Sequence, residues 1–189
     1  MTKQDVREIY KQKRLAISSK EKLKLDDLLL LQFQSFDFST VQTVLSYWPM
    51  ANMAEPNTHL FTGYLRHFVP NLQIAYPICD LKTSDMKAVL INEDTVYKTN
   101  QYGITEPQST QTVAVENIDL VLVPNLIVDK KGFRVGYGKG FYDRFLANCN
   151  TDVTLMGFNY FDPIDRITDT NKFDIPLNFC ITPTNVYEF

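Results

Sequence analysis

Glycines and cations alternate in one short segment of the chain, which reads GFRVGYGKG at residues 132–140. Four of the seven glycines in the chain fall within this segment, and Arg134 and Lys139 lie between them. Glycines allow backbone N–H groups to turn inward and approach an anion closely, and neighbouring cations balance its charge. The segment therefore suits a phosphate group, although a glycine-rich turn with solvated cations would have the same composition.

The flanking residues predict a strand before this loop and a helix after it. Residues 120–123 are an apolar run that Pro124 ends, as in a buried strand. The N-terminus of a following helix adds positive partial charge beside a bound anion. The spacing matches neither G-x-G-x-x-G nor the P-loop, because Gly140 rather than Ser or Thr follows Lys139. The predicted helix has apolar residues at helical spacing, namely Phe141, Tyr142, Phe145 and Leu146.

The whole segment resembles the signature of the 5-formyltetrahydrofolate cyclo-ligase family. The family pattern is P-G-x-x-F-D, a short gap, then G-x-R-L-G-x-G-x-G-Y-Y-D, and here the parts read PNLIVD at 124–129 and GFRVGYGKGFYD at 132–143. The resemblance implies a ligase that converts 5-formyltetrahydrofolate and ATP into 5,10-methenyltetrahydrofolate, ADP and phosphate through a phosphorylated formyl group. The departures remove no charge and no loop glycine; they are Asn125, Val128, Val135 and Phe141.

The resemblance also implies roles for the residues of the loop. Lys139 and Arg134 become catalytic residues that balance charge on the transferred phosphoryl group. Asp143 would hold Mg²⁺ together with waters and phosphate oxygens, and Asp174 is a second expected metal contact. An ordinary acid in the first turn of a helix is the alternative for Asp143. The expected ATP contacts in this segment are Arg134, Gly136, Tyr137, Gly138, Lys139, Gly140, Phe141 and Tyr142.

Residues 3–17 have a helical period and a basic face. At 100° per residue, Lys3, Arg7, Lys11 and Arg14 lie within an arc of roughly 80°. From spacing alone this is ordinarily a solvated helix face. The family begins K-x-x-[LV]-R and adds a second Arg seven residues later, a pattern that this segment matches. The resemblance therefore implies that Lys3 and Arg7 hold the nucleotide phosphates.

Folate contacts are implied elsewhere in the chain. The family binds its folate with a Glu in E-[IVP]-x-T, which Glu55 matches, and Met50 is expected to line the same pocket. A carboxylate suits the amino and ring N–H donors of a pterin, although a Glu ahead of a helix also favours the helix dipole. Tyr102 lies in a segment similar to [WFY]-G-I-x-E-P and is a candidate stacking surface or a core aromatic residue. Tyr137 and Phe141 are further candidates for contact with folate.

Strand and helix patterns alternate along the chain, which predicts an α/β fold. We expect a three-layer α/β/α, Rossmann-like architecture with a largely parallel sheet, as a single domain over residues 1–189. Asn178 stands where the family pattern has a second Asp after Asp174, so that position keeps a hydrogen-bond acceptor without the charge. The expected strands are 41–48, 72–78, 86–91, 120–123, 153–158 and 179–182, and the expected helices are 3–17, 19–33, 57–68 and 141–146.

Composition restricts the classes of function. A net charge of −3 argues against nucleic-acid binding, and two histidines make a zinc site a poor interpretation. No apolar run is long enough to cross a membrane, and three scattered cysteines suit a reducing compartment. We therefore expect a cytoplasmic monomer that binds small molecules. The alternatives are a sugar-phosphate isomerase or acyl-CoA transferase-like enzyme, and a nucleic-acid-binding module that uses the basic N-terminal helix.

Overall fold

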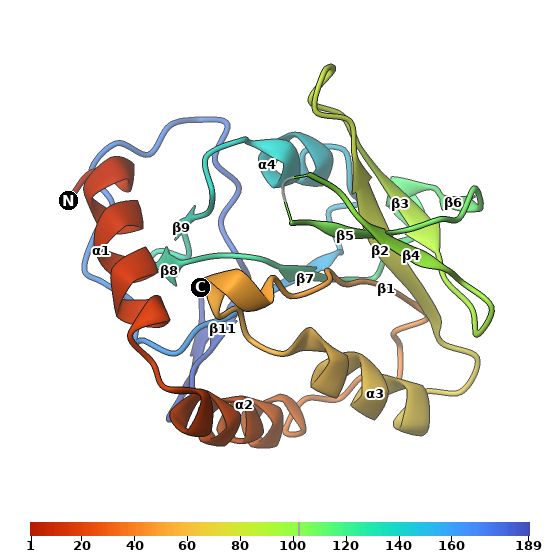
Figure 1. The fold of residues 1–189 in the computed structure, drawn as a ribbon, viewed down its shortest axis with the longest axis horizontal. Helices are drawn as coiled ribbons and strands as arrows, with labels where there is room; N and C mark the ends of the chain where they lie inside the picture. Colours follow the sequence, from red (N-terminus) through yellow and green to blue (C-terminus); the bar gives the residue numbers. More distant parts are fainter. Residues whose placement is uncertain (102) are drawn as a thin grey trace.

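The computed structural model, which describes residues 1–101 and 103–189, is a central β-sheet with helices on both faces (Figure 1). Within these residues the sheet has eight strands in the order β12-β11-β10-β7-β1-β2-β3-β6. Neighbours from β11 to β2 run parallel, whereas β12, β3 and β6 pair antiparallel at the two ends. The predicted α/β fold with a largely parallel sheet is confirmed. The strands are β1 (Thr43–Leu45), β2 (Gln73–Cys79), β3 (Met86–Leu90), β6 (Thr112–Val113), β7 (Leu120–Val123), β10 (Thr154–Phe158), β11 (Phe179–Ile181) and β12 (Val186–Glu188).

Strand β7 shows why the sheet has helices on both sides. Its residues alternate: Leu120 and Leu122 pack into the core under α2 (Ser19–Phe33) and α3 (Thr58–Phe68). Val121 and Val123 pack into the opposite core, under α4 (Phe141–Leu146). A strand buried on both faces needs apolar residues at every position, which explains its continuous apolar run.

The connections of the sheet diverge at β1 and β7. After β1 the chain crosses to β2 on one side, while β7 lies on the other side of β1 and leads on to β10 and β11. Ligands of open α/β sheets bind beyond the carboxyl ends of the strands at such a divergence. The segments that follow these two strands contain Glu55 and the glycine-rich loop, so the fold places both at the expected position.

Helix α1 (Lys3–Leu15) packs against the segments that follow β1 and β7. Its apolar residues Val6 and Tyr10 pack on the hairpin of β8 (Ile127–Val128) and β9 (Arg134–Val135). In Figure 1, α1 lies beside this hairpin, and two of its cations contact the glycine-rich loop: Arg7 donates to the carbonyl of Gly136, and Arg14 donates to the hydroxyl of Tyr137.

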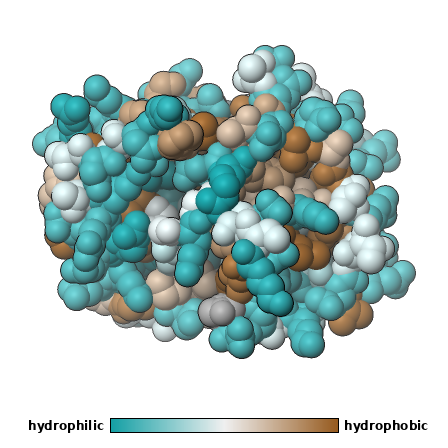
Figure 2. All heavy atoms as spheres, turned by 90° about the horizontal axis from the view of Figure 1, so that it is seen from above, coloured by the Kyte–Doolittle hydropathy of each residue, from teal (hydrophilic) through white to brown (hydrophobic). Residues whose placement is uncertain are grey.

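A further hairpin, β4 (Tyr97–Thr99) with β5 (Thr105–Pro107), contacts β2, and short 3₁₀ turns follow β1 and precede β7. These turns are η1 (Ala51–Met53) and η2 (Val115–Asn117). Seen from above, on the side of α4, the surface is mainly hydrophilic, with hydrophobic residues exposed in small patches (Figure 2). None of the helices in the described residues combines the length and the apolar character needed to cross a bilayer.

Candidate functional site

Glu55 and Tyr137 join the two segments that follow β1 and β7. Glu55 lies just beyond η1 and is only 3% exposed. Its Oε2 accepts a 2.7 Å hydrogen bond from the backbone N–H of Met50, and its Oε1 accepts a 2.5 Å hydrogen bond from the Tyr137 hydroxyl. The predicted folate residues Met50, Glu55 and Tyr137 are therefore in one cluster.

The electrostatic environment of Glu55 contains opposing effects. Burial raises the pKa of its carboxyl group, while the hydrogen bonds from Met50 and Tyr137 and the charge of Arg14 lower it. Burial and the neighbouring Glu55 raise the pKa of Tyr137, so its hydroxyl stays a neutral donor. A carboxylate oxygen has two lone pairs, so Glu55 keeps acceptor capacity for a ligand.

Arg14 completes this cluster from α1. It is 2% exposed and donates through Nη1 to the carbonyl of Asn125 at 3.0 Å and through Nη2 to the Tyr137 hydroxyl. Its Nε is buried and has no hydrogen-bond partner within the residues that the structure describes. Sequence reasoning did not assign Arg14 to the site, although it ends the N-terminal motif and lies seven residues from Arg7, on the same helix face.

The glycine-rich loop is shaped by left-handed backbone and by contact with α1. Gly138 has a φ of 89°, a value that side chains disfavour. A Cβ built there would lie 3.3 Å from the guanidinium carbon of Arg7, whose Nε donates a 2.9 Å hydrogen bond to the carbonyl of Gly136. Lys139 is exposed, and its ammonium makes no hydrogen bond or ion pair in the described part of the chain. The loop therefore presents the exposed ammonium group of Lys139 next to glycine backbone that an anion can approach closely.

The helix after the loop is too short to have a large dipole. Helix α4 begins as predicted at Phe141 but has six residues, and Gly140 precedes it in a left-handed conformation with no side-chain cap. Because the dipole of so short a helix is small, the loop N–H groups and cations are the stronger candidates for anion binding.

Polar contacts join the glycine-rich loop, α4 and α1 to the C-terminal segment. Arg134 is buried, and its Nη2 lies 2.9 Å from Oδ1 of Asp143, while its Nη1 donates to the carbonyl of Ile175. Oδ1 of Asp143 also accepts from the N–H of Ile175 at 3.1 Å. Lys3 Nζ lies 2.6 Å from both carboxylate oxygens of Asp174. Burial lowers the pKa of Arg134, and the charge of Asp143 opposes this shift, so the guanidinium stays charged.

Whether Asp143 and Asp174 could hold Mg²⁺ depends on which of their oxygens already have partners. The described residues contain no group of three or more His, Cys, Asp or Glu arranged for a metal ion. Oδ2 of Asp143 accepts no hydrogen bond from any described residue, whereas both oxygens of Asp174 contact Lys3. Mg²⁺ bound through phosphates needs only one or two carboxylates, so Asp143 fits such a role better than Asp174. Both metal roles remain predictions.

The remaining predicted contacts lie at the edge of this cluster. The hydroxyl of Tyr142 is buried without a hydrogen-bond partner among residues 1–101 and 103–189, and its ring packs into the core around α4. Phe141 is half-buried beneath the guanidinium of Arg144, 5.7 Å from its ring centre. Tyr102 lies outside the described residues. Asn178 accepts a 2.7 Å hydrogen bond from the N–H of Leu155 through Oδ1, so its amide joins β11 to β10.

Comparison with known proteins shows the family of this chain. A model of the 5-formyltetrahydrofolate cyclo-ligase family matches residues 1–172. The chain is 27% identical over 186 residues to the 5-formyltetrahydrofolate cyclo-ligase of Mycoplasma pneumoniae, which covers 96% of this chain and 98% of that protein. It is 40% identical over 87 residues to the enzyme of that name from Haemophilus influenzae, a match that covers 44% of this chain and 46%, or about half, of the relative.

Two solved structures have the same fold. The 5,10-methenyltetrahydrofolate synthetase of Aquifex aeolicus superposes with a TM-score of 0.78 at 23% identity, covering 100% of this chain and 93% of that one. The 5,10-methenyltetrahydrofolate synthetase of Mycoplasma pneumoniae gives 0.76 at 24% identity, covering 97% and 99%. Since the family model matches nearly the whole chain and the fold agrees, the chain belongs to the 5-formyltetrahydrofolate cyclo-ligase family.

Proposed function

We propose that this chain catalyses the ATP-dependent cyclisation of 5-formyltetrahydrofolate to 5,10-methenyltetrahydrofolate, with release of ADP and phosphate. The observation that carries the proposal is the hydrogen bond from Tyr137 to Glu55. It joins a carboxylate suited to a pterin with a glycine-rich loop suited to phosphate. An enzyme that phosphorylates a folate needs these two binding functions next to each other. We include residues 1–189 in this single catalytic domain.

The chemical difficulty is the oxygen of the formyl group. N10 of the folate must attack the formyl carbon, and the oxygen must then leave, yet hydroxide is a poor leaving group. Transfer of the γ-phosphoryl group of ATP to that oxygen forms an O–P bond and releases ADP. Ring closure then forms the N10–carbon bond, breaks the carbon–oxygen bond, and releases phosphate and the N10 proton. The protein contributes mainly positioning and charge balance.

On the nucleotide side, the backbone of residues 136–140 would hold the phosphates. Lys139 is the free cation of this loop and the candidate for contact with the transferred group. Arg7 and Lys3 approach from α1, and Arg134, near the start of the loop, contributes further positive charge. Mg²⁺ would neutralise phosphate charge when bound, and Oδ2 of Asp143 is the oxygen suited to hold it.

On the folate side, Glu55 would accept hydrogen bonds from the amino and ring N–H groups of the pterin. Tyr137 and the N–H of Met50 fix the carboxylate in place before the substrate binds. The hydroxyl of Tyr137 therefore orients the carboxylate that would bind folate, and its backbone is part of the loop that would bind phosphate.

The orientation of α1 supports this proposal over a nucleic-acid module. Arg14 is buried, and Arg7 bonds to the loop carbonyl of Gly136, so these cations face inward. Lys11 remains on the surface. No contact within the described residues favours the isomerase or transferase alternatives.

The test is the absorbance of methenyltetrahydrofolate during incubation with 5-formyltetrahydrofolate, with and without ATP and Mg²⁺. We expect product only when all three are present, with one ADP per product. Product formed without nucleotide consumption would contradict the proposal. We further propose a monomeric, cytoplasmic enzyme, in keeping with three unpaired cysteines, and sedimentation and cell fractionation test this.

A further inference from the structure

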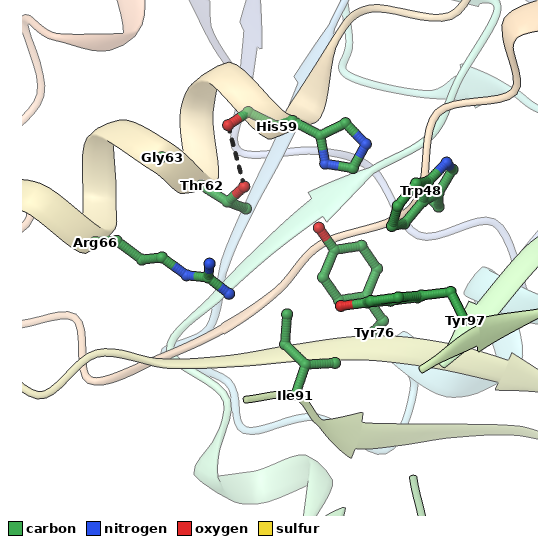
Figure 3. A pocket seen from close by; sticks show the side chains of 8 residues that line it. All are labelled: Trp48, His59, Thr62, Gly63, Arg66, Tyr76, Ile91 and Tyr97. Carbon is green, nitrogen blue, oxygen red and sulfur yellow. Dashed lines mark hydrogen bonds between the residues drawn. The ribbon is translucent and has the colours of Figure 1, made fainter. Parts of the chain in front are cut away.

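A surface cavity of about 370 Å³, open to solvent, lies between α3 and strands β2 and β4, outside the site described above (Figure 3). Its volume falls within the range of pockets that hold small ligands. None of its lining residues belongs to the Glu55 cluster or to the glycine-rich loop. The residues that carry the argument are Trp48, His59, Gly63, Arg66, Tyr76 and Tyr97.

Aromatic rings form the inner wall of the cavity. The centres of the Trp48 and Tyr97 rings are 4.7 Å apart with an interplanar angle of 50°, and those of Tyr76 and Tyr97 are 6.2 Å apart at 78°. Because these rings meet at steep angles, they do not cover one another by parallel stacking. Such a wall offers ring faces and edges to a flat aromatic ligand.

One cation stands at the opening. Arg66 is exposed and makes no hydrogen bond or ion pair with any described residue. Figure 3 shows its side chain extending from α3 toward Tyr76 and Tyr97. Burial and the charge of Arg66 lower the pKa of His59, so the imidazole is neutral at neutral pH. No Asp or Glu is among the described residues that line the cavity, so Arg66 remains available for a carboxylate, which its planar fork can bind through two hydrogen bonds.

We propose that this cavity binds a flat aromatic ring that carries a carboxylate, with the ring among Trp48, Tyr76 and Tyr97 and the carboxylate on Arg66. Two sources have this chemistry. One is the aminobenzoyl-glutamate half of the folate in the proposed function, since Trp48 lies two residues before Met50. The other is a separate aromatic acid. The binding site itself does not depend on the cyclisation activity.

The chain carries its own reporter, because Trp48 is its only tryptophan. We expect N-benzoyl-glutamate to change the Trp48 fluorescence saturably, and uncharged benzamide to bind much more weakly. Arg66→Gln should weaken binding about tenfold or more, since charge-assisted hydrogen bonds are lost. Arg166→Gln, which removes another exposed arginine, should leave binding unchanged.

A second pair of variants tests the cavity without changing its charge. A Cβ at Gly63 meets nothing within 4 Å, so Gly63→Ala should fold and bind normally, while Gly63→Leu should occupy the cavity and abolish binding. Thermal unfolding of each variant verifies folding. The absence of a saturable signal, or equal affinity in the wild type, Arg66→Gln and Gly63→Leu, would overturn the inference.

Competition identifies the source of the ligand. If N-benzoyl-glutamate raises the KM for 5-formyltetrahydrofolate, the cavity takes part of the substrate; if the KM is unchanged, it takes a separate acid. Both results uphold the site. If the wild-type protein binds the probe but has no cyclisation activity, the proposed function is contradicted. The inference about the cavity would still stand.

Discussion

The hydroxyl of Tyr137 donates a 2.5 Å hydrogen bond to Glu55 across 82 positions of sequence. Glu55 follows β1 and Tyr137 follows β7, and these are the strands at which the connections of the sheet diverge. A single hydrogen bond thus links the two halves of the proposed site. Substitutions on either side of it should have separable effects on folate and on ATP.

Tyr137→Phe removes this link. A hydrogen bond to a charged group contributes about 1.5–3 kcal/mol, so we expect that loss in the free energy of unfolding and a rise of about tenfold or more in the KM for folate. Denaturant unfolding and steady-state kinetics measure the two effects. Tyr187→Phe is the control, because it removes a hydroxyl that donates to Asp162 at 3.0 Å on the edge strand β12. A Tyr137→Phe variant that behaves like this control would show that the link is unimportant.

Glu55→Gln should raise the KM for folate about tenfold or more while leaving the KM for ATP nearly unchanged. The ionised form is needed to accept pterin donors, so kcat/KM for folate in the wild type should rise with pH through the pKa of Glu55. Burial raises that pKa, so this rise should lie at higher pH than for an exposed glutamate. Gln does not titrate, and the variant should lose this part of the pH profile. A change in the KM for ATP alone would reverse our assignment of the two sides.

The free energy of unfolding should also depend on the ionisation of Glu55, but this contribution should fall as pH rises. Because the pKa of Glu55 is raised in the folded chain, the folded state holds more protons than the unfolded state in the interval from 4.5 up to the raised value. The contribution of Glu55 to the free energy of unfolding therefore falls as pH rises through this interval. The difference between wild type and Glu55→Gln, measured by denaturant unfolding across pH, isolates this contribution. A difference that does not vary with pH would rule it out.

Arg14 should lower the pH at which Glu55 ionises. Its charge lowers the pKa of Glu55, so Arg14→Gln should shift the acid side of the kcat/KM profile to higher pH. Arg14→Lys keeps the charge but loses the paired hydrogen bonds to Asn125 and Tyr137, so its acid side should stay nearer to that of the wild type. An unshifted profile in Arg14→Gln would mean that Arg14 acts only as a packing residue.

Lys139→Ala should reduce turnover by about 10²-fold or more, as the loss of one group that stabilises transition-state charge commonly does. The thermal unfolding midpoint should barely change, because Lys139 is exposed and its ammonium is unpaired within the residues that the structure describes. Lys131→Ala, at another exposed lysine nearby, is the control for surface charge. Full activity in the folded Lys139→Ala variant would remove this residue from the mechanism.

Gly138→Ala and Gly63→Ala should change stability in opposite directions. Gly138 has a positive φ, and a Cβ there lies 3.3 Å from Arg7, so we expect a loss of about 1–2 kcal/mol and a higher KM for ATP. Gly63 is inside α3 with open space around it, so Ala should stabilise by about 0.5–1 kcal/mol. Thermal unfolding compares the two. Equal effects would show that the loop conformation does not require glycine.

The helices and strands that position the site could be predicted where burial imposes a regular period of apolar residues. Strand β7 is apolar at every position because both of its faces are covered, and α3 has one apolar face because only one side packs. Strands β8 and β9 are too short for any period, so the hairpin that carries α1 was not predicted. The strand expected over 41–48 is shorter in the structure, where β1 is Thr43–Leu45.

The loop residues could be predicted from their types, but their partners could not. Arg14 and Lys11 share a helix face in sequence, yet only Arg14 is buried, because the packing of α1 on the β8–β9 hairpin decides which cation turns inward. The pairing of Arg134 with Asp143 depends in the same way on the path of the intervening loop. Periodicity describes one element at a time, whereas these contacts need two elements in a fixed relation.

The ion pair between Lys3 and Asp174 has a consequence for biosynthesis, since it spans 171 positions. On the ribosome, the first helix emerges long before its partner carboxylate has been translated. The nascent protein therefore cannot fix α1 to this carboxylate until Asp174 has left the exit tunnel.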